Sequence, residues 1–167
     1  MLLRILLLNM IFSVLFCFAD KSGKELDWKE LGKGMELSKE EEKPLFVYIY
    51  STHCGWCRRF NKATLQDTSV VRILSENFIV SRPNTSSTKK QGFKGKKATE
   101  RQLAAMFAVR GVPSSVFLDS NGKLITKLPG FMPPDVFKKV LKYIGEKWYK
   151  DMSYQEFLES EKKLEKK

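Results

Sequence analysis

Two cysteines three positions apart are the residues of this chain with the clearest chemistry. They lie in the motif Cys54-Gly55-Trp56-Cys57. The apolar run before them, residues 45–50, is rich in β-branched and aromatic residues and predicts a buried strand. Residues 58–66 contain no Gly or Pro and predict a helix. Cysteines at i and i+3 share one face of the first helical turn, so their sulfurs can close a disulfide or open into a dithiol.

The N-terminus has the layout of a secretory signal peptide. A short start containing Arg4 is followed by an apolar run over 5–18, and Ala19 precedes an abrupt change to polar residues. This predicts residues 1–19 as a signal peptide and a periplasmic or otherwise exported protein. The alternative is a retained anchor, although the run is short for a membrane span and Asn9 interrupts it.

The number and spacing of the cysteines favour a catalytic disulfide over structural disulfides. If Cys17 leaves with the signal, only the pair Cys54 and Cys57 remains, whereas small exported proteins held together by disulfides carry more cysteines. The loop that this pair would close is so short that it constrains little of the unfolded chain. We therefore interpret it as a redox-active disulfide and expect no other cofactor.

Composition indicates one globular domain with a core of its own. The chain has 167 residues, of which 43% are hydrophobic, and its formal net charge is +11. The excess of Lys and Arg is scattered and accompanies no nucleic-acid-binding motif, so we expect no nucleic-acid partner. We interpret the charge mainly as a source of solubility.

The order of predicted elements indicates an α/β fold with a mixed central sheet flanked by helices. A parallel start and an antiparallel hairpin at the end, turned by Asn121-Gly122, produce this mixed sheet. We expect one domain with this fold over 20–150 and a C-terminal helical tail over 151–167. Strands are predicted at 45–50, 78–80, 115–119 and 124–128, and helices at 24–42, 58–66, 70–76, 99–109, from 133 onward and from 153 onward. The last helix is preceded by the capping-box pattern Ser153-x-x-Glu156.

Residues 82–98 differ from the rest because they combine Pro, Gly and Ser with five lysines. This composition predicts a polar, basic loop. We interpret it as a solvated insertion, with a docking patch for an acidic partner as the alternative.

In this arrangement the chain resembles the thioredoxin superfamily, and within it the exported thioredoxin-like proteins. The resemblance covers about 40–144. A lone CxxC motif is a weak signal, but here four features follow one another in the family's order. They are the apolar strand into Cys54-Gly55-Trp56-Cys57, the helix ending in Phe107-Ala108-Val109-Arg110, the turn Gly111-Val112-Pro113, and Phe117-Leu118-Asp119-Ser120-Asn121-Gly122-Lys123 leading to Leu128-Pro129-Gly130.

The resemblance implies roles for residues beside the dithiol. Pro113 is expected to follow a cis peptide bond, and the backbone of Val112 to pair with an extended substrate segment. Gly130 is expected to leave room for that substrate. Trp56 is expected to pack on the substrate or to shield Cys57.

Three departures from the family pattern leave the direction of the reaction open. Tyr48 stands where typical thioredoxins place a buried acid, and His53 stands where they place tryptophan. Trp56 occupies a position that is often proline, which brings the motif closer to disulfide isomerases.

The position of Cys54 at a helix N-terminus predicts that it is the nucleophile. Free N–H groups and the helix dipole stabilise a thiolate there. We expect Arg58, Arg59 and His53 to favour the same charged form. Cys57 would then resolve the mixed disulfide.

The leading hypothesis is an exported, monomeric thiol–disulfide oxidoreductase that reduces protein substrates and is itself reduced by a membrane-embedded donor. An isomerase or oxidase of the same fold is the first alternative. A metal-binding module is the second, with His53, Cys54 and Cys57 as ligands, although zinc sites normally need four. A non-catalytic binding domain would not need both cysteines.

Overall fold

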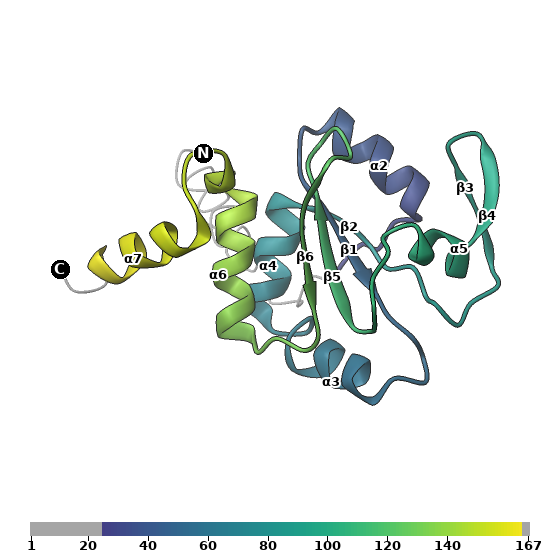
Figure 1. The fold of residues 1–167 in the computed structure, drawn as a ribbon, viewed down its shortest axis with the longest axis horizontal. Helices are drawn as coiled ribbons and strands as arrows, with labels where there is room; N and C mark the ends of the chain where they lie inside the picture. Colours follow the sequence, from purple (N-terminus) through teal and green to yellow (C-terminus); the bar gives the residue numbers. More distant parts are fainter. Residues whose placement is uncertain (1–24, 165–167) are drawn as a thin grey trace, which may run out of the picture.

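The computed structural model describes residues 25–164, so the expected signal peptide at 1–19 lies outside the described residues. The elements follow in the order expected of an α/β fold (Figure 1). The helices are α2 (Leu31–Glu40), α3 (Gly55–Ala63), α4 (Thr68–Asn77), α5 (Glu100–Ala105), α6 (Pro134–Gly145), the 3-10 helix η2 (Trp148–Lys150) and α7 (Tyr154–Leu164). The strands are β1 (Leu45–Ile49), β2 (Ile79–Ser81), β3 (Lys90–Phe93), β4 (Lys96–Thr99), β5 (Ser114–Leu118) and β6 (Leu124–Pro129).

The central sheet is mixed, as the sequence predicts. Its strand order is β2-β1-β5-β6, with β1 parallel to β2 and antiparallel to β5. β5 and β6 form the antiparallel hairpin at the end. All five residues of β1 and all five of β5 are buried. This burial explains the continuous apolar run of β1, whereas β5 begins with two buried serines, Ser114 and Ser115, before its apolar residues.

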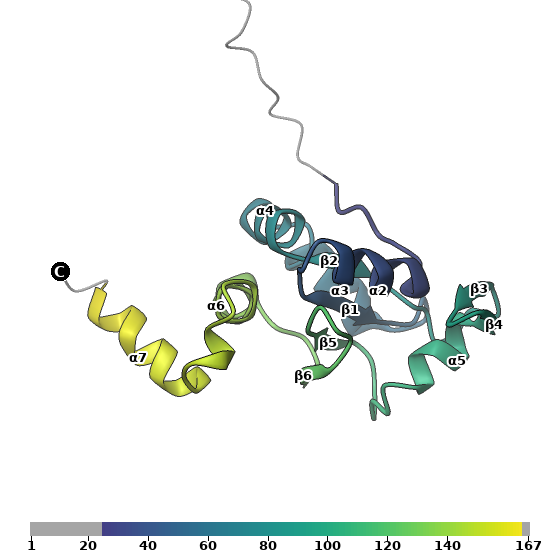
Figure 2. The same ribbon diagram turned by 90° about the horizontal axis from the view of Figure 1, so that it is seen from above.

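Side chains of successive strand residues alternate between two cores on opposite faces of the sheet. Phe46, Tyr48 and Phe117 belong to the first core, which is covered by side chains of α3, α4 and α6. Val47 and Val116 belong to the second, which is covered by α2 and α5. Figure 2 shows these helices on both sides of the strands. The layered arrangement confirms the predicted fold class.

Two helices are shorter than the sequence predicts. The N-terminal helix begins only at Leu31, because the chain before it runs alongside β2, where the Lys29 N–H donates to the Val80 carbonyl at 2.9 Å. α5 ends at Ala105 rather than near 109, and Ala108 adopts a positive φ of 48°. Its N-terminal end is fixed by a capping box between Thr99 and Gln102.

The prediction that residues 82–98 are a polar loop is wrong for their C-terminal half. β3 and β4 form a separate two-stranded antiparallel hairpin there. The strands KQGF and KKAT have little intrinsic β-propensity, so contacts with α2 must hold them. The side-chain oxygen Oε1 of Gln91 accepts the Leu31 N–H at 2.9 Å. A Cβ at Gly32 would overlap the carbonyl oxygen of Gly92, so only glycine permits this close approach.

The last part of the chain adds α6, η2 and α7 beside the sheet. The Ser153 hydroxyl and N–H both donate to the Glu156 carboxylate at 2.7 and 2.8 Å, which confirms the predicted capping box before α7. Within the described residues, none of the helices has the length and apolar character needed to cross a bilayer.

Candidate active site

The two cysteines sit at the start of α3 with unequal exposure. Cys54 is the N-cap residue, and its sulfur accepts the Cys57 N–H at 3.1 Å. Cys54 is half-buried, whereas Cys57 is only 2% exposed. Both thiols are free in this structure. A partner can therefore reach the sulfur of Cys54 but not that of Cys57.

The loop at Val112 and Pro113 contacts Cys54 from a distant part of the chain. The Cys54 thiol donates to the Val112 carbonyl oxygen at 3.5 Å, and the Val112–Pro113 peptide bond is cis. The Gly130 N–H donates to the Pro113 carbonyl at 2.8 Å. Gly130 has a φ of 85°, and a Cβ there would meet nothing within 4 Å. The structure thus brings together the residues that the resemblance assigned to substrate contact.

Tyr48 occupies the space beneath the buried cysteine. Its side chain is 2% exposed, and its hydroxyl donates to the Cys57 carbonyl oxygen at 3.1 Å. Burial, followed by the nearby Cys57, raises the pKa of Tyr48 far above its ordinary value. The residue at the position of the family's buried acid is therefore an uncharged hydrogen-bond donor.

Burial dominates the acid–base properties of the resolving cysteine. It raises the pKa of the Cys57 thiol from 9.0 to about 11, and a hydrogen bond with the Cys54 thiol acts in the same direction. Hydrogen bonds from the Ser51 backbone and the Tyr48 hydroxyl partly oppose these effects. Cys57 thus holds its proton more firmly than an ordinary cysteine does.

We expect this raised pKa to appear as a pH dependence of stability. Below pH 9.0 the thiol is protonated in both states, whereas between 9.0 and about 11 it ionises only in the unfolded chain. The reduced protein should therefore lose roughly 2 to 3 kcal/mol as pH rises through this window. Urea unfolding at several pH values, compared with Cys57→Ala as background, measures the difference. Parallel pH curves for the two proteins would contradict the expectation.

Two of the residues expected to stabilise the Cys54 thiolate, Arg58 and His53, contact neighbouring polar groups. Arg58 Nη1 donates to the Thr52 carbonyl at 3.3 Å. The ring of His53 lies 3.4 Å from the Ser86 hydroxyl through Nδ1. These contacts stabilise the turn that precedes Cys54. That Arg58 and His53 favour the Cys54 thiolate stays a prediction.

Arg59 takes part in an aromatic stack that sequence reasoning missed. Its guanidinium carbon lies 5.2 Å from the centroid of the Trp56 ring and 5.0 Å from that of Phe131. The two rings are themselves 5.9 Å apart. Trp56 is 57% exposed, so this stack forms an apolar and cationic surface beside the CxxC motif. The only sequence signal for Phe131 is its place directly after Gly130.

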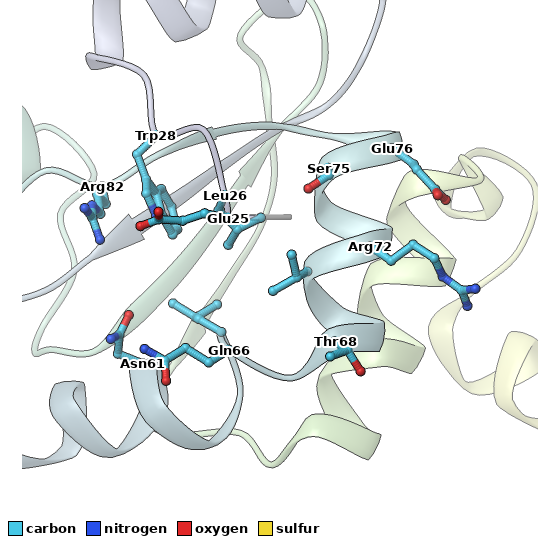
Figure 3. A pocket seen from close by; sticks show the side chains of 12 residues that line it. Glu25, Leu26, Trp28, Asn61, Gln66, Thr68, Arg72, Ser75, Glu76 and Arg82 are labelled. Atoms are coloured by element: carbon cyan, nitrogen blue, oxygen red, sulfur yellow. The ribbon is translucent and has the colours of Figure 1, made fainter. Parts of the chain in front are cut away.

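Two adjoining cavities open on the α3 side of the sheet. One, of about 530 Å³, lies between residues 25–28, the end of α3 and α4 (Figure 3). The second, of about 230 Å³, shares Asn61 and Arg82 with it and reaches Tyr48 and Cys57. The larger cavity has no cysteine among its lining residues, so the chemistry is centred on α3 and the loop at Pro113 instead.

No cluster of three potential metal ligands accompanies the cysteines in the described part of the chain. Among residues 25–164, no three His, Cys, Asp or Glu side chains gather closely enough to hold a metal ion. His53 is the single histidine of the sequence, and its ring is directed to hydroxyl groups. The geometry present is that of a dithiol pair.

Comparison with known proteins points to the same arrangement. A family model described as a thioredoxin-like domain matches residues 31–145. The thiol:disulfide interchange protein DsbD of Photorhabdus laumondii is 28% identical over 120 residues, which are 71% of this chain and 19% of that protein. The disulfide bond reductase DsbH of Chlamydia pneumoniae is 25% identical over 109 residues, 65% of this chain and 64% of that protein. The chain thus spans less than a fifth of the DsbD relative and under two thirds of DsbH.

Among solved structures, a thioredoxin-fold protein from Helicobacter pylori superposes with a TM-score of 0.65. It is 28% identical in sequence, and the match covers 74% of this chain and 87% of that one. The likeness therefore extends over about three quarters of this chain.

Proposed function

This chain belongs to the thioredoxin-like family, and from that premise we propose that it is a thiol–disulfide oxidoreductase that reduces disulfides in protein substrates through Cys54 and Cys57. The observation that carries this proposal is the unequal exposure of the two sulfurs. Cys54 is half-exposed at a helix N-terminus, and Cys57 is buried against it. The Cys54 sulfur can therefore react with a partner, and the Cys57 sulfur is close enough to react with Cys54 in a second step.

The proposed cycle has two exchange steps. The Cys54 thiolate attacks one sulfur of the substrate disulfide, so a mixed disulfide forms and the other substrate sulfur leaves as a thiolate that takes up a proton. Cys57 then gives up its proton and attacks the Cys54 sulfur. This step releases the second substrate thiol and leaves a Cys54–Cys57 disulfide. Two electrons have passed from the protein to the substrate.

The surroundings of Cys54 suit an extended protein segment. The Val112 carbonyl contacts the reactive sulfur, and Gly130, which donates to the Pro113 carbonyl, carries no side chain that would block an approaching chain. The exposed Trp56 offers an apolar contact beside them. We assign these residues, with Pro113, to substrate binding.

Each turnover leaves the pair oxidised, so a reductive cycle needs an electron supply. We propose that the protein is exported through residues 1–19 and acts as a monomer reduced by a membrane-embedded donor. The charge and apolar pattern of those residues supports export. The names of the interchange and reductase relatives are consistent with exchange of protein disulfides.

An isomerase or oxidase of the same fold is the competing function, because Trp56 replaces the proline of typical thioredoxins and Tyr48 replaces the buried acid. The reduction potential of the Cys54–Cys57 pair separates the two. We expect a value near about −270 mV, as in thioredoxin, after equilibration against glutathione and dithiothreitol buffers. A value between about −120 and −180 mV would indicate an oxidase or isomerase and would overturn the reductase assignment.

A further inference from the structure

The β3–β4 hairpin carries the densest positive charge in the described part of the chain. Five lysines between 89 and 97 are exposed, and no acidic residue occurs between 89 and 99. They are Lys89, Lys90, Lys94, Lys96 and Lys97. The only ion pair that reaches them within the described residues joins Lys89 to Glu30, at 3.5 Å. The redox site uses none of these side chains.

One face of the hairpin packs against the core beside α2, and the other face is exposed. Gln91 is 7% exposed and is hydrogen-bonded to the start of α2, and Phe93 and Ala98 pack against the core on that side. Because side chains alternate along a strand, Lys90 and Lys97 lie on the opposite face of the hairpin. Lys94 and Gly95 form the turn, and Lys96, which pairs with Phe93, is exposed at the turn end of the packed face. Packing of the first face therefore leaves the opposite, basic face, with Lys90 and Lys97, exposed to solvent.

This basic face lies away from the reactive sulfur. Figure 1 shows the hairpin projecting at the upper right of the molecule, whereas α3, with Cys54 at its N-terminal end, lies at the lower edge. A partner held by the hairpin would therefore leave Cys54 open. The patch is better placed to hold the protein on a surface than to select a disulfide.

We propose that the β3–β4 hairpin binds the surface of an anionic phospholipid bilayer. Its charges are all lysines, which act as hydrated point charges and lack the bidentate geometry by which arginine recognises a single group. Lysine is depleted in protein–protein interfaces, and none of the exposed large apolar side chains of the described residues lies on the hairpin. Clusters of four to eight basic residues are typical of electrostatic binding to anionic lipid.

Such binding would keep the enzyme at a membrane while its dithiol faces the solvent. The attraction requires no pocket and no fixed stoichiometry. It should weaken steeply with salt, because charges separated by more than a Debye length of about 10 Å at 0.1 M ionic strength are screened. The proposal does not depend on the direction of the redox reaction.

The test compares sedimentation of the full chain with vesicles of phosphatidylcholine alone and with vesicles that also contain phosphatidylglycerol. The ratio of the two partition coefficients is the readout, because it cancels any apolar attachment through the N-terminus. The test variant is K90Q/K96Q/K97Q. The matched control is K39Q/K123Q/K150Q, which removes the same charge from three exposed lysines on other segments.

Each lysine near an anionic surface contributes about fivefold to binding, so the hairpin variant should lower the ratio by about a hundredfold. The control variant should lower it by less than about threefold, since its lysines are spread over the molecule. Circular dichroism establishes that both variants are folded. Equal losses in the two variants, or no preference of the wild type for the anionic vesicles, would overturn the proposal and direct attention to an acidic protein partner.

Discussion

Replacing Cys54 by serine is expected to abolish disulfide reduction, whereas replacing Cys57 by serine should stop the cycle after its first step. Cys54 is the accessible sulfur at the start of α3, and a serine hydroxyl is a far weaker nucleophile than a thiolate. We expect the rate to fall on the order of a thousandfold or more in Cys54→Ser. Reduction of a protein disulfide with dithiothreitol as the electron source measures it.

The two variants differ in what accumulates. Cys57→Ser retains the attacking sulfur but cannot resolve the mixed disulfide, so mass spectrometry should detect a covalent adduct of protein and substrate. Cys54→Ser should form no such adduct at the active site, because Cys57 is 2% exposed. The opposite pattern, with an adduct at Cys57, would show that the roles of the two cysteines are reversed.

Replacing Phe117 by alanine is expected to cost about 3 to 5 kcal/mol of unfolding free energy. The ring belongs to β5 and is fully buried. It stacks on Phe46 at 5.2 Å between centroids and meets Phe78 edge to face at 5.9 Å. Truncation would leave a cavity between the sheet and the helices that cover it. Urea denaturation of the variant and the wild type gives the difference.

A second aromatic residue provides the control for this experiment. Trp56 is 57% exposed, so Trp56→Ala should change the unfolding free energy by no more than about 0.5 kcal/mol. The same variant should weaken substrate reduction if Trp56 contacts the partner. Equal destabilisation by the two substitutions would contradict the assignment of Phe117 to the core and of Trp56 to the surface.

Local sequence patterns predicted the elements of the fold whose signals lie in short stretches of sequence. The apolar runs of β1 and β5 indicated buried strands, and the Asn121-Gly122 turn indicated the hairpin between β5 and β6. The capping box at Ser153 placed the start of α7. In each case the signal lies within a few neighbouring residues, so no knowledge of distant contacts was required.

The β3–β4 hairpin was missed for the opposite reason. Its residues are lysines and glycines that favour solvent and turns, and the strands are held by Gln91 and Gly92 against α2, about sixty positions earlier in the chain. No local window contains that contact. Likewise, the start of α2 at Leu31 depends on the pairing of Lys29 with the chain of β2.

The reacting groups can be identified from the sequence, because the spacing of Cys54 and Cys57 after a strand places both sulfurs at one helix start. The difference between the two thiols arises from the packing of the folded chain. This packing buries Cys57 over the Tyr48 hydroxyl, and it brings Val112 and Phe131 to the site from distant segments. Burial and long-range contact control the access and acidity of a thiol, and these properties arise only when segments remote in sequence pack together.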